Sequence, residues 1–298
     1  MSRILITGAS GLVGAHLFAR LERAGHIVTG SFCENGGRVP VMDPRSSLMA
    51  LDLSEPSSIE QAFRLARPET VIHAAALSDL GYCEQHPDEA QRVNVDATVE
   101  LAALCRRAGA RFIHCSSDQV FDGERGGYSE GDPARPLHVY GRTKREAEQR
   151  VAEACPGATA LRLALVLGAS PSGTRSASEQ IVGALRDGRR VRLFTDEFRT
   201  PVLVDEVART IQALLARDGP DVLHVAGPER ISRFALGQLI ARTAGLDAGC
   251  IEPARRADAP RSPERPRDLS LSTERLRSLG FPPHPALEAA LRDTAAGS

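Results

Sequence analysis

Short runs of aliphatic and β-branched residues alternate with longer segments in which apolar residues recur every three or four positions. The first pattern is typical of buried parallel strands and the second of amphipathic helices. The pattern predicts strands over residues 3–8, 26–32, 47–52, 70–76, 111–117 and 158–168, and helices over residues 12–25, 57–69, 88–109 and 138–154. Strands joined by crossover helices form a parallel sheet, so we expect a doubly wound α/β (Rossmann) fold.

The alternation is looser beyond Gly168, where shorter strands and helices are predicted. A strand-to-helix unit at residues 200–217 is expected to rejoin the first sheet. Residues 253–271 are rich in Arg, Pro and Asp, which favours a surface or lid loop. We therefore expect a Rossmann domain over residues 1–168 and a smaller α/β lobe, holding the substrate, over residues 169–298.

Composition excludes several classes of protein. The formal net charge of −1, from 37 Lys+Arg and 38 Asp+Glu, argues against nucleic-acid and membrane-surface binding. No apolar run is long enough to span a bilayer, and the first predicted strand begins at Arg3, so we expect no signal peptide and a cytoplasmic enzyme. The six cysteines lack the spacing of a zinc site and are expected to be reduced, with no metal bound.

Three glycines follow the first predicted strand directly, in the segment GASGLVG. Gly8 permits a tight turn, Gly11 lets the backbone approach a pyrophosphate, and Gly14 allows close packing of the next helix. The amino end of that helix then faces the phosphates. This spacing also occurs in turns that bind nothing, but its position after the first strand predicts a dinucleotide site.

The end of the second predicted strand bears on the choice of cofactor. NAD-binding units usually place Asp or Glu there, whereas this chain has no carboxylate until Glu34. Small polar residues and the nearby Arg38 would admit a 2′-phosphate, so NADP(H) is favoured and NAD(H) is the alternative. Arg38 is equally well explained as a solvated loop arginine.

Two further segments are candidates for the cofactor site. Asp52 follows the third predicted strand and could meet the adenine edge, or it could cap the next helix. Ala74, Ala75 and Ala76 suit close approach of a backbone to a ligand, although small core residues would have the same composition.

Tyr140 and Lys144 lie four residues apart, on one face of a predicted helix. Lys144 is the only lysine of the chain, and a compact ammonium can hydrogen-bond a ribose where a planar guanidinium does so poorly. We expect it to lower the pKa of Tyr140, which would then donate a proton to a carbonyl oxygen. Ser117 is the candidate to hold that oxygen. The alternatives are an ordinary surface pair and a turn serine.

These motifs, in this order, resemble the extended short-chain dehydrogenase/reductase family, and within it the dTDP-4-dehydrorhamnose reductases. The resemblance is carried by the segments HAAALSDLGYCEQHPDEAQRVNVDAT, SSDQVFDG, YGRTKREAE and RPRDLSLSTERL. It implies a catalytic trio of Ser117, Tyr140 and Lys144. The cofactor-binding residues it implies, with Tyr140 and Lys144, are Gly8, Ser10, Gly11, Leu12, Val13, Asp52, Leu53, Ala74, Ala75 and Ala76.

The resemblance also implies substrate contacts at Ser78, Asp118, Gln119 and Arg199. Arg199 would bind the diphosphate of a nucleotide sugar, since a guanidinium binds phosphate oxygens bidentately. An ion pair with Asp196 or Glu197 is the alternative. The chain departs from these reductases at Gln119, where they carry tyrosine, at Arg199, where they carry glycine, and near Leu165, where an aromatic is usual.

The function that this resemblance implies is NAD(P)H-dependent reduction of a keto group on a sugar nucleotide, with a homodimer expected by analogy. A sugar-nucleotide epimerase or dehydratase would use the same trio, but a dehydratase needs an acidic pair and Asp118–Gln119 offers one carboxylate. A third possibility is an NADP-binding regulatory subunit without turnover, similar to the beta subunit of methionine adenosyltransferase.

Overall fold

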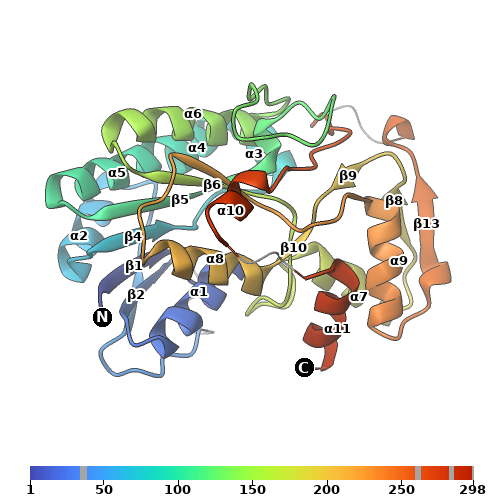
Figure 1. Ribbon diagram of the computed structural model, residues 1–298, viewed down its shortest axis with the longest axis horizontal. Helices are drawn as coiled ribbons and strands as arrows, with labels where there is room; N and C mark the ends of the chain where they lie inside the picture. The colour runs from blue at the N-terminus through green and yellow to red at the C-terminus, as the bar shows by residue number, and fades with distance from the viewer. Residues whose placement is uncertain (34–38, 259–262, 282–284, 297–298) are drawn as a thin grey trace.

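Seven parallel strands form the central sheet of this computed structural model, which describes residues 1–33, 39–258, 263–281 and 285–296. The strands run in the order β11-β6-β5-β4-β1-β2-β3 (Figure 1). Their bounds are β1 Arg3–Thr7, β2 Ile27–Phe32, β3 Ser47–Ala50, β4 Thr70–His73, β5 Arg111–Ser117, β6 Thr159–Leu163 and β11 Val222–Val225. The predicted doubly wound α/β fold is confirmed.

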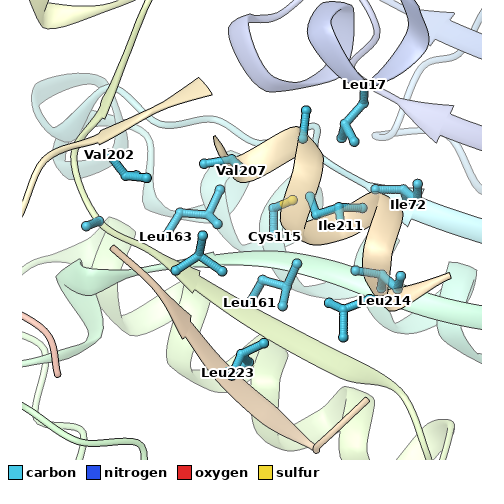
Figure 2. Packing of buried hydrophobic residues seen from close by; sticks show 14 of the residues in the cluster. Leu17, Ile72, Cys115, Leu161, Leu163, Val202, Val207, Ile211, Leu214 and Leu223 are labelled. Atoms are coloured by element: carbon cyan, nitrogen blue, oxygen red, sulfur yellow. The ribbon is translucent and has the colours of Figure 1, made fainter. Parts of the chain in front are cut away.

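Helices cover both faces of the sheet, and two hydrophobic clusters result. One face carries α1 (Leu12–Arg23) and α8 (Val204–Leu214), whose apolar residues meet β5, β6 and β11 in the packing of Figure 2. The other face carries α2 (Pro56–Ala66), α5 (Ala97–Ala108) and α6 (Val139–Ala154). None of the helices in the described ranges combines the length and apolar character that crossing a bilayer requires.

The order of the strands reverses between β1 and β4. The chain goes outward from β1 to β2 and β3 on one side, and from β4 to β5 and β6 on the other. At such a point the loops leaving two neighbouring strands diverge, and this opens a crevice at the carboxyl ends of the strands. The glycine-rich turn after β1 and the alanines after β4 both lie at this crevice.

Three two-stranded sheets follow the central sheet. They pair β7 (Val166–Leu167) with β10 (Val202–Leu203), β9 (Phe198–Arg199) with β12 (Ile231–Ser232), and β8 (Val191–Phe194) with β13 (Ile251–Ala254). The helices of this part are α7 Ala177–Arg186, α9 Arg233–Thr243, α10 Glu274–Ser278 and α11 Leu287–Ala296. Residues of α7, α9 and α11 form a third hydrophobic cluster. These three helices lie at the right of Figure 1.

The segment at residues 200–217 contributes differently from the prediction. Its strand β10 pairs with β7 outside the central sheet, while its helix α8 packs against α1. The strand that extends the central sheet is β11, which comes later in the chain and pairs with β6. The division of the chain at residue 168 stays a prediction.

Several element boundaries also differ. The helix predicted over residues 88–109 is α4 (Pro87–Gln91), a π-helical turn (Arg92–Asp96) and α5 in succession. The strand predicted over residues 158–168 divides into β6 and β7, because the chain leaves the central sheet after Leu163. The predicted loop over 253–271 begins inside β13, which extends a sheet with β8. The remaining short elements are α3 (Leu80–Gln85) and 3-10 turns at Asp118–Val120, Ala248–Cys250 and Arg256–Asp258.

Candidate active site

A cavity of about 700 Å3 opens at the carboxyl ends of the central strands. Its wall includes every residue predicted for the site except Arg199. These are Gly8, Ser10, Gly11, Leu12, Val13, Asp52, Leu53, Ala74, Ala75, Ala76, Ser78, Ser117, Asp118, Gln119, Tyr140 and Lys144. The structure therefore brings the predicted cofactor residues and the predicted catalytic trio to one continuous hollow.

The glycine-rich turn is packed as closely as backbone allows. Gly8 has a φ of 71°, and a Cβ built there would lie 2.9 Å from the backbone nitrogen of Ala75. A Cβ on Gly14 would lie 2.1 Å from the carbonyl oxygen of Gly8. Helix α1 begins here without a side-chain cap, so its first N–H groups are available to phosphate oxygens. The turn fits a dinucleotide.

Near β2 and β3, Asp52 is the one carboxylate among the described residues that line the cavity. The Asp52 carboxylate accepts hydrogen bonds from the Ser54 backbone nitrogen at 2.8 Å and from the Ser54 hydroxyl at 2.7 Å. These bonds lower the pKa of Asp52, so it is an ionised acceptor at neutral pH. Helix α2 is preceded by Glu55 as its cap residue, not by Asp52. Glu34 and Arg38 lie outside the described residues.

The three residues of the predicted catalytic trio come from two elements. Ser117 is the last residue of β5, while Tyr140 and Lys144 lie in the first two turns of α6. The Ser117 hydroxyl lies 3.2 Å from Oδ1 of Asp118 and accepts a hydrogen bond from the Gln119 backbone nitrogen. Lys144 lines the cavity and is only 1% exposed, so its side chain is shielded from bulk water.

Burial sets the proton affinities of the pair. Desolvation raises the pKa of Tyr140, and a hydrogen bond with Ser117 opposes this shift only in part. The predicted lowering of the Tyr140 pKa is therefore wrong for this structure, because desolvation outweighs the stabilisation of the phenolate. Burial also lowers the pKa of Lys144 to about 8, although electrostatic interaction with Cys115 and Glu148 raises this pKa in part. At neutral pH the phenol holds its proton and the amine is largely charged.

Arg199 lies behind the cavity wall, 5% exposed, between two carboxylates. Its guanidinium Nη2 is 3.2 Å from Oε1 of Glu197, and its Nε is 3.6 Å from Oδ2 of Asp118. The ion pair with Glu197 that the sequence left open is thus present, and Arg199 is not brought to the cavity. Burial raises the pKa of Asp118 to about 6, although Arg199 opposes that shift.

Two residues that hydrogen-bond to the helix carrying Tyr140 and Lys144 were not predicted. His138 caps α6, because its Nδ1 accepts a hydrogen bond from the Gly141 backbone nitrogen, and its Nε2 lies 2.9 Å from Oε1 of Gln119. Burial lowers the His138 pKa to about 4, which keeps the ring neutral and lets one nitrogen accept while the other donates. His138 lies two positions before Tyr140 in the sequence. No local pattern indicates its contact with Gln119, which lies in a segment distant along the chain.

Asn94, in the π-helical turn, is the second of these residues. Its amide nitrogen donates to the Leu77 carbonyl at 2.9 Å and its amide oxygen accepts from the Leu77 backbone nitrogen at 2.8 Å. The same amide nitrogen lies 3.2 Å from the hydroxyl of Thr143. This side chain therefore ties the loop after β4 to the catalytic helix, and a π-helical turn at such a position is common at functional sites.

Comparison with known families identifies the relatives of this chain. Residues 1–297 match the model of the RmlD substrate binding domain. The chain belongs to the RmlD family. It is 35% identical over 265 residues to a probable low-salt glycan biosynthesis reductase, Agl14, of Haloferax volcanii, covering 88% of this chain and 87% of the relative. It is 31% identical over 293 residues to the dTDP-4-dehydrorhamnose reductase of Mycobacterium tuberculosis, covering 94% and 88%.

Two further similarities bear on the remaining alternatives. The methionine adenosyltransferase 2 subunit beta of Bos taurus is 28% identical over 286 residues, covering 94% of this chain and 83% of the relative. The fold matches a crystal structure of Bacillus anthracis dTDP-4-dehydrorhamnose reductase in complex with NADP, with a TM-score of 0.88, 22% identity and full coverage of both chains. Membership of the RmlD family makes the chain an oxidoreductase of the extended short-chain dehydrogenase/reductase type, as predicted.

Proposed function

We propose that this chain uses NADPH to reduce a keto group on a sugar nucleotide. The observation that carries the proposal is the single cavity in which the glycine-rich turn adjoins Ser117, Tyr140 and Lys144. Reductase names among the most similar relatives support the same reaction class. The lobe formed by residues 169–298 would hold the sugar nucleotide against the Rossmann domain of residues 1–168.

Each member of the trio has a distinct task in this proposal. When bound, a nicotinamide cofactor would supply the hydride that reduction of the substrate carbonyl requires. Tyr140, protonated at neutral pH because burial raises its pKa, transfers its phenolic proton to the carbonyl oxygen. Ser117 donates a hydrogen bond to that same oxygen. Lys144 holds the nicotinamide ribose, and its positive charge favours the phenolate that remains on Tyr140 until solvent reprotonates it.

A preference for NADPH over NADH follows from the end of β2. The residues that line the cavity there are Ser31, Phe32 and Cys33, none of which carries an acidic side chain. A carboxylate at this place would bind the two ribose hydroxyls of NADH and repel the 2′-phosphate of NADPH. Titrating the protein with each cofactor tests the preference, and tighter binding of NADH would contradict it.

The reaction is tested by mixing purified protein with NADPH and a dTDP-4-keto-6-deoxy sugar, and following the absorbance of the reduced cofactor. We expect consumption of NADPH that Tyr140→Phe abolishes and that Tyr128→Phe, at a tyrosine outside the cavity wall, preserves. NADPH binding without consumption across a panel of keto-sugar nucleotides would favour a regulatory protein instead. A product sugar with an inverted stereocentre, formed without net consumption of NADPH, would favour an epimerase.

A homodimer is a separate prediction, which light scattering tests.

A further inference from the structure

Arg175 stands where the active-site cavity meets a second hollow of about 520 Å3. The two hollows share the loop of Ala76, Leu77 and Ser78 as well as Arg175. Among the described residues that line either hollow, Lys144 and Arg175 are the only lysine and arginine side chains. Among these described lining residues, Arg175 is therefore the positive charge that a ligand would meet if it extended beyond Ser117, Tyr140 and Lys144.

The guanidinium of Arg175 has no hydrogen-bond or ion-pair partner among the residues that the structure describes. By contrast, Arg199 lies between Glu197 and Asp118. Arg230, another arginine of the same lobe, pairs with Asp268 at 2.7 Å. An exposed, unpaired guanidinium at a cavity has a planar set of donors suited to phosphate oxygens.

The loop that carries Arg175 is held at both ends. Ser170 binds the Glu179 carboxylate through its hydroxyl, at 2.9 and 3.0 Å. Ser176 donates from its backbone nitrogen to the same carboxylate at 2.8 Å and from its hydroxyl to the Gly168 carbonyl at 2.6 Å. These bonds fix the backbone on either side of Arg175, so less loop entropy is lost when a ligand binds.

The phosphate that reaches Arg175 can be assigned to the substrate or to the cofactor. The cofactor diphosphate has its own donors in the glycine-rich turn and the start of α1. The second hollow contains no residue of that turn. The residues that line it and not the first cavity are Asp79, Gly81, Tyr82 and Gln85. We propose that Arg175 binds the diphosphate of a nucleoside diphosphate in the substrate and so selects nucleotide sugars. This assignment rests on the proposed function.

Calorimetry on the NADPH-loaded protein tests the assignment without turnover. We expect dTDP to bind the wild-type protein and Arg175→Ala to weaken that binding by about 10- to 100-fold, since a hydrogen-bonded charge contributes on that scale. Thymidine binding and NADPH affinity should not change. Arg186→Ala, at an exposed arginine near the end of α7, is the matched control and should bind dTDP as the wild type does.

Three results would overturn the assignment: no dTDP binding to the wild type, unchanged dTDP binding to Arg175→Ala, or a loss of NADPH affinity in that variant with dTDP affinity retained. The last of these results would show that Arg175 binds the cofactor and not the substrate. The proposed reduction can fail separately, because a protein that binds dTDP through Arg175 but consumes no NADPH keeps this inference and loses the reductase. Where turnover occurs, Arg175→Ala should raise KM and leave kcat nearly unchanged.

Discussion

A Cβ built on Gly141 would lie 2.2 Å from the carbonyl oxygen of Gln119. The helix that carries Tyr140 therefore touches the backbone of the turn that follows Ser117, with no room for a side chain between them. His138 reinforces this contact from the start of the same helix, because its Nε2 lies 2.9 Å from Oε1 of Gln119. This contact sets how close Tyr140 comes to Ser117.

Gly141→Ala should separate the two halves of the catalytic site. The added methyl group must push α6 away from the turn, and a displacement of about 1 Å at the reacting groups costs on the order of 100-fold in rate. We expect kcat to fall by about that factor, measured as NADPH consumption, while NADPH still binds. Gly183→Ala in α7, where an added Cβ meets nothing within 4 Å, is the control and should keep full activity. Equal activities of the two variants would show that the contact does not position the trio.

The fold and the placement of Tyr140 and Lys144 on one face of a helix could be predicted because both depend on local patterns. The catalytic roles of these residues stay a prediction. The turn at Gly8 follows a strand directly, and the four-residue spacing of Tyr140 and Lys144 on a helix determines that they share a face. Each of these features is complete within about ten residues of sequence. The burial, pKa and ion-pair partners of each side chain depend on packing between segments that are distant in the sequence. These properties were therefore predicted less well.

Arg199 and Tyr140 show how that limit arises. The two carboxylates that engage Arg199 come from different segments, and only the fold determines that they surround it and keep it from the cavity. The sign of the Tyr140 pKa shift depended on how deeply the phenol is buried, which no local pattern reports. Arg175 likewise sits in a polar loop whose sequence gives no sign that it reaches the cavity.

The titration of Lys144 can be observed directly, because it is the only lysine of the chain. Burial lowers its pKa from 10.5 to about 8, so the amine should lose its charge as the pH rises through about 8. Labelling with ¹³C-lysine should give one side-chain NMR signal whose shift changes around that pH. Because the charged amine supports the proposed reaction, kcat should fall over the same range.

The lowered pKa of Lys144 also predicts how the free energy of unfolding changes with pH. The pKa of Lys144 in the folded state lies below its value in the unfolded chain, so burying the charged amine costs stability below about pH 8. That cost diminishes as the pH rises from about 8 towards 10.5. An NMR titration with a midpoint near 10.5 would show that the amine is solvated. It would contradict both the predicted loss of charge near pH 8 and the predicted dependence of stability on pH.

Glu148, a residue of α6, forms a buried ion pair with Arg162 of β6, and their side chains are 2% and 3% exposed. The guanidinium makes two bonds to the carboxylate, at 2.8 and 2.9 Å, and the Ser116 hydroxyl donates a third at 2.6 Å. Glu148→Gln leaves Arg162 as an uncompensated buried charge, which costs roughly 3–5 kcal/mol. We expect the free energy of unfolding in urea to fall by about that amount.

Glu146→Gln on the same helix is the matched control, since the side chain of Glu146 is 43% exposed and its pairing with Arg150 is solvent-screened. A change of about 0–1 kcal/mol is expected there. Similar losses in the two variants would mean that the buried pair contributes no more than a surface one. Glu148→Gln should also lower the pKa of Lys144 further, because Glu148 is one of the charges that raise it.

Gly14 and Gly11 offer a graded test of the cofactor site. A Cβ on Gly14 would lie 2.1 Å from the Gly8 carbonyl oxygen, whereas one on Gly11 would lie 3.2 Å from the same atom. Gly14→Ala must therefore shift helix α1 away from the turn, and the first N–H groups of α1 would move out of reach of the cofactor diphosphate.

Titrating each variant with NADPH should show an affinity loss of at least about 100-fold for Gly14→Ala and a smaller loss for Gly11→Ala, since misplaced charged hydrogen bonds cost on that scale. Gly131→Ala, which meets nothing within 4 Å, should bind as the wild type does. If Gly14→Ala fails to fold, Gly11→Ala carries the test, and unchanged NADPH affinity in that variant would argue against a diphosphate seated on this turn.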